Sequence, residues 1–244
     1  MIDPEKSRTN GVFNSRYWRR HPIRAFKYSA RGWRYGMAPL DDRERLPAGY
    51  DDVLKEFDEA EQNARCDDHH WYGGRLQRER VAALADLSLG RHPGDIVEIG
   101  ACQGICTALL AAVAAKHGRR VVVIDPWIPG TQDCEGREYE EFRENTAAFT
   151  EHIDVIREPS MAPVVFEQLR DRPVAFSFVD GLHTFDACWS DFLLVRSTAG
   201  LVVADDARYN VEVLAAARIR ARQFGWRVVQ PPDVREAIMF SAGQ

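Results

Sequence analysis

From residue 95 onward, short apolar runs alternate with longer segments in which apolar residues recur at helical spacing. Short apolar runs are typical of buried strands, and recurrence every three or four residues is typical of amphipathic helices. The pattern predicts five strands, at 95–101, 119–127, 153–158, 174–181 and 200–206. It predicts helices at 104–118, 138–149, 161–171, 185–195 and 211–225. Two further helices are expected earlier, at 51–65 and about 75–88.

Two more apolar runs end the pattern, WRVVQ at 226–230 and EAIMFSA at 236–242. Only PPDVR separates them, which is too short for a crossover helix, so we expect an antiparallel hairpin. Strands that alternate with helices predict a parallel sheet covered on both faces. The fold class is therefore α/β, with a Rossmann-like seven-stranded sheet whose last strand is antiparallel. A dinucleotide-binding Rossmann domain has six parallel strands instead.

The first part of the chain has a different character, and we interpret residues 1–66 as an N-terminal extension and 67–244 as the globular domain. Residues 1–40 carry nine Lys and Arg against two acids, interleaved with aromatic residues. Such a basic, aromatic stretch could bind nucleic acid or an anionic membrane surface. The alternative, which the acids of residues 41–61 favour, is an arm that lies on the acidic body or on a partner subunit. A nucleic-acid partner is therefore not expected.

The amino-acid composition further narrows the class of protein. With 45% hydrophobic and 28% charged residues, the chain has the composition of a soluble globular protein. It lacks an uncharged apolar run of about 18 residues, so no transmembrane segment is expected. The N-terminus lacks the apolar stretch of a secretory signal, and the five cysteines include no Cys-x-x-Cys pair. We expect a cytoplasmic protein with reduced thiols, and a homodimer.

The strand ends carry the candidate chemistry, because ligands of open parallel sheets bind beyond the carboxyl ends of the strands. The first strand runs into Gly100 and Gly104, which would let the backbone pass close to a ligand. The second ends in Asp125, whose carboxylate can accept hydrogen bonds from both ribose hydroxyls or, alternatively, cap a turn. The turn is G-x-x-x-G and lacks the G-x-G-x-x-G fingerprint that binds a pyrophosphate. S-adenosylmethionine is therefore favoured over NAD.

Acids also end the fourth and fifth predicted strands, Asp180 on one and Asp205 and Asp206 on the other. Three carboxylates at adjacent strand ends repel one another unless a cation is present, and Mg²⁺ and Ca²⁺ prefer such oxygen ligands. The structural alternative is that these acids cap helices. His183 follows Asp180 by three residues and is the candidate general base, although a hydrogen-bonding loop histidine is the alternative.

Five segments resemble successive motifs of the class I methyltransferases, and are most similar to the metal-dependent macrocin O-methyltransferase-type family. They are VEIGACQG, VVVID, REPS, FVDGLHTFDACWSDF and LVVADD, and the resemblance covers about residues 70–242. It implies that Glu98, Gly100 and Gly104 line the S-adenosylmethionine site, that Asp125 holds the ribose, and that Ser160 lies near the adenine.

The same resemblance implies a divalent metal, expected to be Mg²⁺, with Asp180, Asp205 and Asp206 as its ligands. Asp180 is also expected to bind S-adenosylmethionine and to take part in catalysis. The predicted function is methyl transfer from S-adenosylmethionine to a hydroxyl of a sugar, phenolic or other secondary-metabolite acceptor. Three alternatives stay open: a metal-independent methyltransferase acting on another small molecule, a nucleic-acid-binding Rossmann-like protein that uses its basic arm, and an NAD(P)-linked oxidoreductase.

Overall fold

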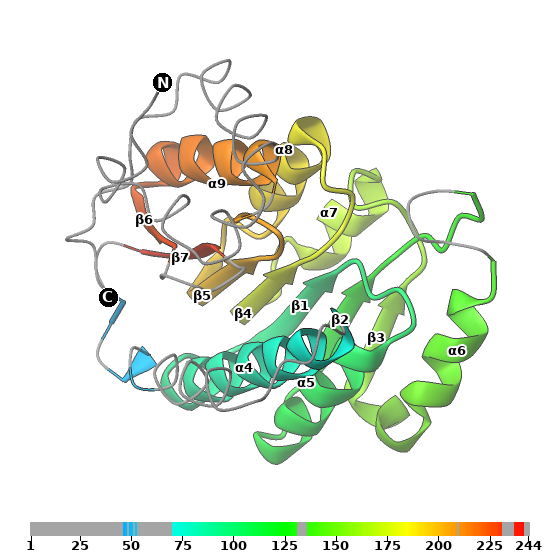
Figure 1. Cartoon of the computed structure of the whole chain (residues 1–244). Helices are drawn as coiled ribbons and strands as arrows, with labels where there is room; N and C mark the ends of the chain where they lie inside the picture. The colour runs from blue at the N-terminus through cyan, green and yellow to red at the C-terminus, as the bar shows by residue number, and fades with distance from the viewer. Residues whose placement is uncertain are drawn as a thin grey trace.

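A seven-stranded sheet forms the centre of the molecule (Figure 1). The computed structural model describes residues 46–47, 49–50, 52, 70–130, 136–208, 210–230 and 237–241. The strand order is β3-β2-β1-β4-β5-β7-β6, and β7 pairs antiparallel with both of its neighbours. The strands are β1 Asp95–Ile99, β2 Val121–Ile124, β3 Ile153–Ile156, β4 Val174–Val179, β5 Thr198–Ala204, β6 Trp226–Val229 and β7 Ala237–Ser241.

Helices cover both faces of this sheet, because successive strand residues point to opposite faces and both sets are apolar. Residues of α4, α5 and α6 pack with Ile96 and Val123 on one face. Residues of α7, α8 and α9 pack with Val97 and Val122 on the other. The helices are α4 His70–Arg91, α5 Ile105–Lys116, α6 Glu138–Asn145, α7 Pro163–Leu169, α8 Phe185–Leu194 and α9 Val211–Phe224, with the 3-10 helix η3 at Ala147–His152.

The predicted fold class is confirmed, including the antiparallel last strand. The predicted strands run past the observed ends, since the chain turns where the left-handed Gly100 follows β1 and where Pro126 follows β2. The helix predicted at 138–149 is shorter in the structure, because α6 ends at Asn145 with Thr146 as its C-cap at φ −100°, and the 3-10 helix η3 follows. The helix expected at about 75–88 is the longer α4.

The strand order contains a switch point that locates the ligand site. From β1 the chain winds outward through β2 to β3, and from β4 it winds the other way to β5. Ligands of such sheets bind at the carboxyl ends of the strands where this direction reverses. Here that point lies between β1 and β4, which are parallel neighbours: Ile96 pairs with Phe176, and Ile99 pairs with Val179.

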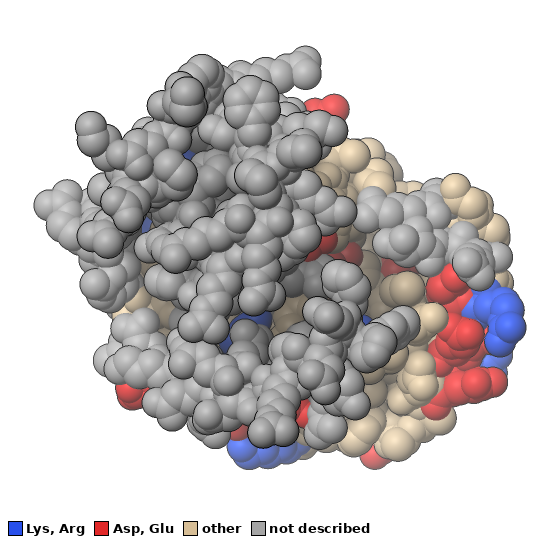
Figure 2. Space-filling model, in the orientation of Figure 1, with Lys and Arg blue, Asp and Glu red and all other residues tan. Residues whose placement is uncertain are grey.

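The described residues bear on two expectations, the absence of a transmembrane segment and the distribution of charge on the surface. No helix in that part of the chain combines the length and apolar character of a membrane span. Figure 2 shows acidic and basic side chains side by side at the right-hand edge of the molecule, where α6 carries Glu140, Glu141 and Arg143. The basic arm, the helix expected at 51–65 and most of the proposed 1–66 extension lie outside the described residues.

Candidate active site

A cavity of about 620 Å³ lies at the switch point, at the carboxyl edge of the sheet. Residues that follow β1, β2, β4 and β5 line it, and α4 contributes one wall through Gln77, Arg78 and Val81. Of the predicted site residues, the lining includes Gly100, Asp125, Ser160, Asp180, His183, Asp205 and Asp206. Seven of the nine predicted site residues thus line one cavity.

Gly100 joins the ends of β1 and β4 at very close range. Its φ is +86°, and a Cβ built on it would overlap the carbonyl oxygen of Asp180. The backbone continues the sheet here, since the Asp180 N–H donates to the Ile99 carbonyl at 2.8 Å. A side chain at residue 100 would therefore force apart the two strands that carry the site.

Gly104 has a different role from the one expected. It precedes α5 with φ +75°, and an added Cβ would lie 2.7 Å from the Phe142 ring. Gly104 thus packs against α6 and is absent from the cavity lining, whereas its neighbours Gln103 and Ile105 belong to it.

Asp125 organises the loops around the cavity. Its Oδ2 accepts hydrogen bonds from the backbone N–H groups of Ala101 and Cys102, at 2.9 and 3.0 Å. Its Oδ1 accepts one from the N–H of Trp127 at 2.8 Å. Oδ2 already accepts two hydrogen bonds, whereas Oδ1 can accept one more, so the capping role and contact with a ligand are compatible.

Glu98 lies beneath the cavity and does not line it. The side chain is completely buried between β1 and α5, where the Thr107 hydroxyl donates to Oε2 at 2.6 Å. Burial raises the pKa of Glu98 to about 8, and the negative charges of Asp180 and Asp125 act in the same direction. At neutral pH Glu98 is therefore mainly a neutral acid that supports the donor loop from below.

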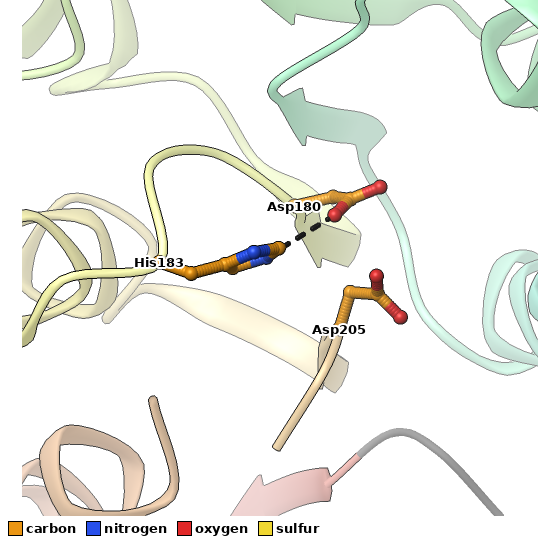
Figure 3. Close-up of side chains that lie close together, drawn as sticks. All are labelled: Asp180, His183 and Asp205. Carbon is orange, nitrogen blue, oxygen red and sulfur yellow. Dashed lines mark ion pairs between the residues drawn. The ribbon is translucent and has the colours of Figure 1, made fainter. Parts of the chain in front are cut away.

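Three potential metal ligands converge above β4 and β5 (Figure 3). Asp180, His183 and Asp205 each place a ligand atom within 4.8 Å of the others. The sheet ladder aims the acids, since the Asp205 N–H donates to the Val179 carbonyl at 2.9 Å. Carboxylate oxygens with an imidazole nitrogen form a donor set that suits several divalent cations.

The imidazole of His183 lies between two acids. Nε2 is 3.3 Å from Oδ1 of Asp180, and Nδ1 is 3.6 Å from Oδ2 of Asp206. The loop is held from outside the cavity by Asn210, whose side chain donates to the His183 carbonyl at 2.7 Å. Asp206 thus contacts His183 and lies beside the group formed by Asp180, His183 and Asp205. Its backbone has a left-handed φ of +53°.

Ser160 is tied to an acid that the sequence did not single out. Its hydroxyl donates to Oδ1 of Asp191 at 2.5 Å, and both residues line the cavity. Burial raises the pKa of Asp191 to about 6, against the opposing effects of the Ser160 hydrogen bond and of His183. Asp191 projects from α8 toward Gly181, so it connects the loop after β3 to the loop that carries Asp180 and His183.

Gln77 and Arg78 were also missed, because they lie in a helix that precedes the first strand. Gln77 donates from its amide to Oδ1 of Asp205, and both side chains are buried. Residues 77, 78 and 81 share one face of α4, so helical spacing was the signal available. Which face of α4 meets the cavity depends on its packing across the sheet.

A seven-stranded sheet with an antiparallel β7 and a cavity at the switch point is the fold of the class I methyltransferases. Residues 97–207, which run from β1 past the end of β5, match the family model described as a methyltransferase domain. The chain therefore has the class I methyltransferase fold, and its residues 97–207 match a methyltransferase domain.

Solved structures share this fold at low sequence identity. The apo structure of CalS11, described as a TDP-rhamnose 3′-O-methyltransferase of calicheamicin biosynthesis, has a TM-score of 0.54 and 13% identity, covering 82% of this chain and 97% of its own. The O-methyltransferase NovP has a TM-score of 0.51 and 20% identity, covering 68% and 79%. No curated protein sequence matches the chain significantly.

Proposed function

We propose that the chain transfers the methyl group of S-adenosylmethionine to a hydroxyl of a sugar or secondary-metabolite acceptor, with the help of a divalent cation. The observation that carries the proposal is the convergence of Asp180, His183 and Asp205 within 4.8 Å in the lining of a cavity of about 620 Å³. One of the similar structures is described as acting on a hydroxyl of TDP-rhamnose, which supports a sugar acceptor.

The donor's adenosine end is assigned to the residues that follow β2 and β3. Asp125 accepts a ribose hydroxyl through the remaining lone pair of Oδ1, and Ser160, held by Asp191, lies at the adenine. Gly100 lets the donor pass close to the backbone, and Glu98 supports this loop from beneath. With the donor held in this way, its sulfonium methyl would be available to an acceptor held at the cluster above β4 and β5.

Asp180 and Asp205 hold the cation, with Asp206 as the third carboxylate of the expected set. When bound, the cation lowers the pKa of the acceptor hydroxyl and orients it. His183 accepts the hydroxyl proton as general base, and the acids on either side of its ring stabilise the imidazolium that forms. The oxygen–methyl bond then forms as the methyl–sulfur bond breaks, which leaves S-adenosylhomocysteine and the methyl ether.

Apolar side chains at the cavity rim match the remaining ligand surface. Ile105, Ile128, Met161 and Leu182 are large, exposed and part of the cavity lining. Exposed apolar residues that gather at one place commonly mark a binding site. They provide contacts for the adenine faces and for apolar parts of the acceptor.

Chelation and one substitution test the proposal. Methyl transfer to sugar and phenolic acceptors is measured with S-adenosylmethionine, before and after EDTA treatment and with Mg²⁺ or Mn²⁺ restored. We expect EDTA and Asp180→Asn each to abolish turnover, while S-adenosylhomocysteine still binds. Full turnover after chelation would instead establish the metal-independent methyltransferase, in which the acids are structural. The cytoplasmic location and the homodimer stay predictions.

A further inference from the structure

A buried acid of α8, Asp191, faces two loops of the cavity at once. Its side chain belongs to the cavity lining, although the residue is only 1% exposed. Oδ1 accepts a hydrogen bond from the Ser160 hydroxyl in the loop after β3, 31 positions away in the sequence. Oδ2 lies 3.3 Å from the position that a Cβ on Gly181 would take, against the loop after β4. One carboxylate therefore lies between the two loops.

The sheet does not join these loops directly. In the strand order, β2 and β1 lie between β3 and β4 (Figure 1). Ladder hydrogen bonds connect only neighbouring strands, so a movement at the end of β3 would have to pass through two strands to reach β4. The side chain of Asp191 provides a shorter connection, from the face of the sheet that α7 and α8 cover.

The loop after β4 is attached to α8 at further points. The thiol of Cys188, one turn before Asp191 on the same face of the helix, donates to the Leu182 carbonyl at 3.6 Å. Thr184, which ends the loop, is the N-cap of α8. The loop that carries two of the candidate cation ligands is thus held by the helix that carries Asp191.

The burial of Asp191 requires a reason, because a carboxylate that leaves water is stabilised only where polar contacts compensate. Asp191 is not a member of the group that could hold the cation, which consists of Asp180, His183 and Asp205. Its contacts are instead with the loops that carry the ligand-binding residues. This arrangement is expected of a residue that positions other groups.

We propose that Asp191 is a positioning residue that couples the two parts of the site, so that the methyl donor and the divalent cation each strengthen the binding of the other. This inference rests on the proposed function, in which the adenosine lies at Ser160 and the cation at Asp180 and Asp205. A donor that contacts the Ser160 loop fixes the hydroxyl and, through it, the carboxylate. The carboxylate then holds Gly181 and with it the direction of the neighbouring Asp180. Linkage makes the effect reciprocal, so the cation favours the donor by the same factor.

Two binding measurements determine the coupling without any turnover. The Kd of S-adenosylhomocysteine is measured by calorimetry in EDTA and again in saturating Mn²⁺, and the ratio of the two values is the coupling factor. The Kd of Mn²⁺ with and without S-adenosylhomocysteine, followed by electron paramagnetic resonance, must give the same factor. S-adenosylhomocysteine is chosen because it has no sulfonium charge to repel the cation.

The variants remove the connection from either side. Asp191→Ala removes the carboxylate, Asp191→Asn keeps its shape and one oxygen acceptor, and Ser160→Ala removes the hydrogen bond while leaving α8 unchanged. Asp186→Ala, an exposed acid of the same helix, is the matched control.

We expect a coupling factor of about 10 in the natural protein, within the usual range for linked sites. Asp191→Ala and Ser160→Ala should each reduce it to less than about twofold, because the two loops then lose their shared contact. Asp191→Asn should keep an intermediate factor, and Asp186→Ala the full one.

The coupling factor separates a positioning role from a merely structural one. A structural role would weaken the binding of both ligands in Asp191→Ala and leave the factor unchanged, and that result would overturn the inference. If Asp191→Ala does not fold, Ser160→Ala decides the question by the same criterion.

Failure of the inference and failure of the proposed function give different results. If the natural protein binds both ligands with a factor near 1, the inference is wrong and the proposed function stands. If it binds S-adenosylhomocysteine but no divalent cation, the metal-dependent function is wrong and the inference fails with it.

Discussion

The side-chain amide of Gln77 donates a 2.5 Å hydrogen bond to Oδ1 of Asp205, and joins residues 128 positions apart in the sequence. The contact fixes one carboxylate oxygen of a candidate metal ligand. It also makes α4, which precedes the sheet, part of the site. Groups that orient metal ligands in this way commonly tune metal affinity.

Gln77→Leu should therefore weaken divalent-cation binding by about 10- to 100-fold, because Asp205 loses the group that orients it. The measurement is the Mg²⁺ or Mn²⁺ concentration that gives half-maximal turnover. Gln168→Leu, an exposed glutamine on α7, is the control and should leave this concentration unchanged. An unchanged metal requirement in Gln77→Leu would show that Asp205 is not a ligand.

His183→Ala should lower kcat by about 10²- to 10⁴-fold, the usual contribution of a general base. The Kd of S-adenosylhomocysteine should change little, because the imidazole lies between Asp180 and Asp206 and away from the ribose contacts of Asp125. His152→Ala, at the end of η3, is the control. If His183→Ala abolishes metal binding and kcat together, His183 is a ligand and the base must be sought elsewhere.

Gly100→Ala should destabilise the protein by more than about 2 kcal/mol and abolish donor binding. The new methyl group would collide with the Asp180 carbonyl, in addition to the unfavourable positive φ. Gly118→Ala has a similar φ of +64° with nothing within 4 Å, and should cost only about 1 kcal/mol. Urea unfolding compares the two variants, and equal losses would mean that the contact with Asp180 is unimportant.

Glu98→Gln should be more stable than the natural protein at pH 8, and the difference should vanish below about pH 4.5. Burial raises the pKa of Glu98 to about 8 in the folded state, above the value of 4.5 for an exposed glutamate. The stability contributed by its bound proton is complete below pH 4.5 and is lost as the pH rises through 8. The natural protein should lose roughly 1.4 kcal/mol per pH unit relative to the variant across that interval.

Urea unfolding between pH 4 and 9 measures this difference, and other titrating groups cancel because both proteins contain them. Glu144→Gln, on the exposed side of α6, is the matched control. Parallel stability curves for Glu98→Gln and the natural protein would show that Glu98 is ionised in the folded state.

The fold was predictable because its signals are local. VVVI of β2 is apolar at every position, as expected for a strand covered on both faces, and five residues between the last two runs required a hairpin. The boundaries were less predictable. The helix predicted at 138–149 ends at Asn145, although no glycine or proline marks the position.

Some residues of the candidate site were predictable from the sequence, and others were not. Asp125, Asp180 and Asp205 follow strands, and the carboxyl ends of parallel strands meet at one edge whatever the packing of the helices. Arg78 and Asp191 lie within helices, where a charged residue is usually on the solvent face. Their orientation is decided by packing across the sheet, which periodicity does not report.

The face of the sheet on which Glu98 lies could also have been predicted from the sequence. Alternate strand residues face opposite sides, so Glu98 shares its face with the fully buried Ile96. This parity places Glu98 against α5 and not in the cavity.

The pairing of β7 with β5 has a consequence for the order in which the molecule can form. Residues 201–204, which lead directly into Asp205, pair with 237–240. A ribosome translates β7 after every residue of the candidate site, so the nascent chain holds β5 as an open edge until its final partner emerges. Catalytic competence should therefore appear late in synthesis, and fragments that stop before residue 237 should be prone to aggregate.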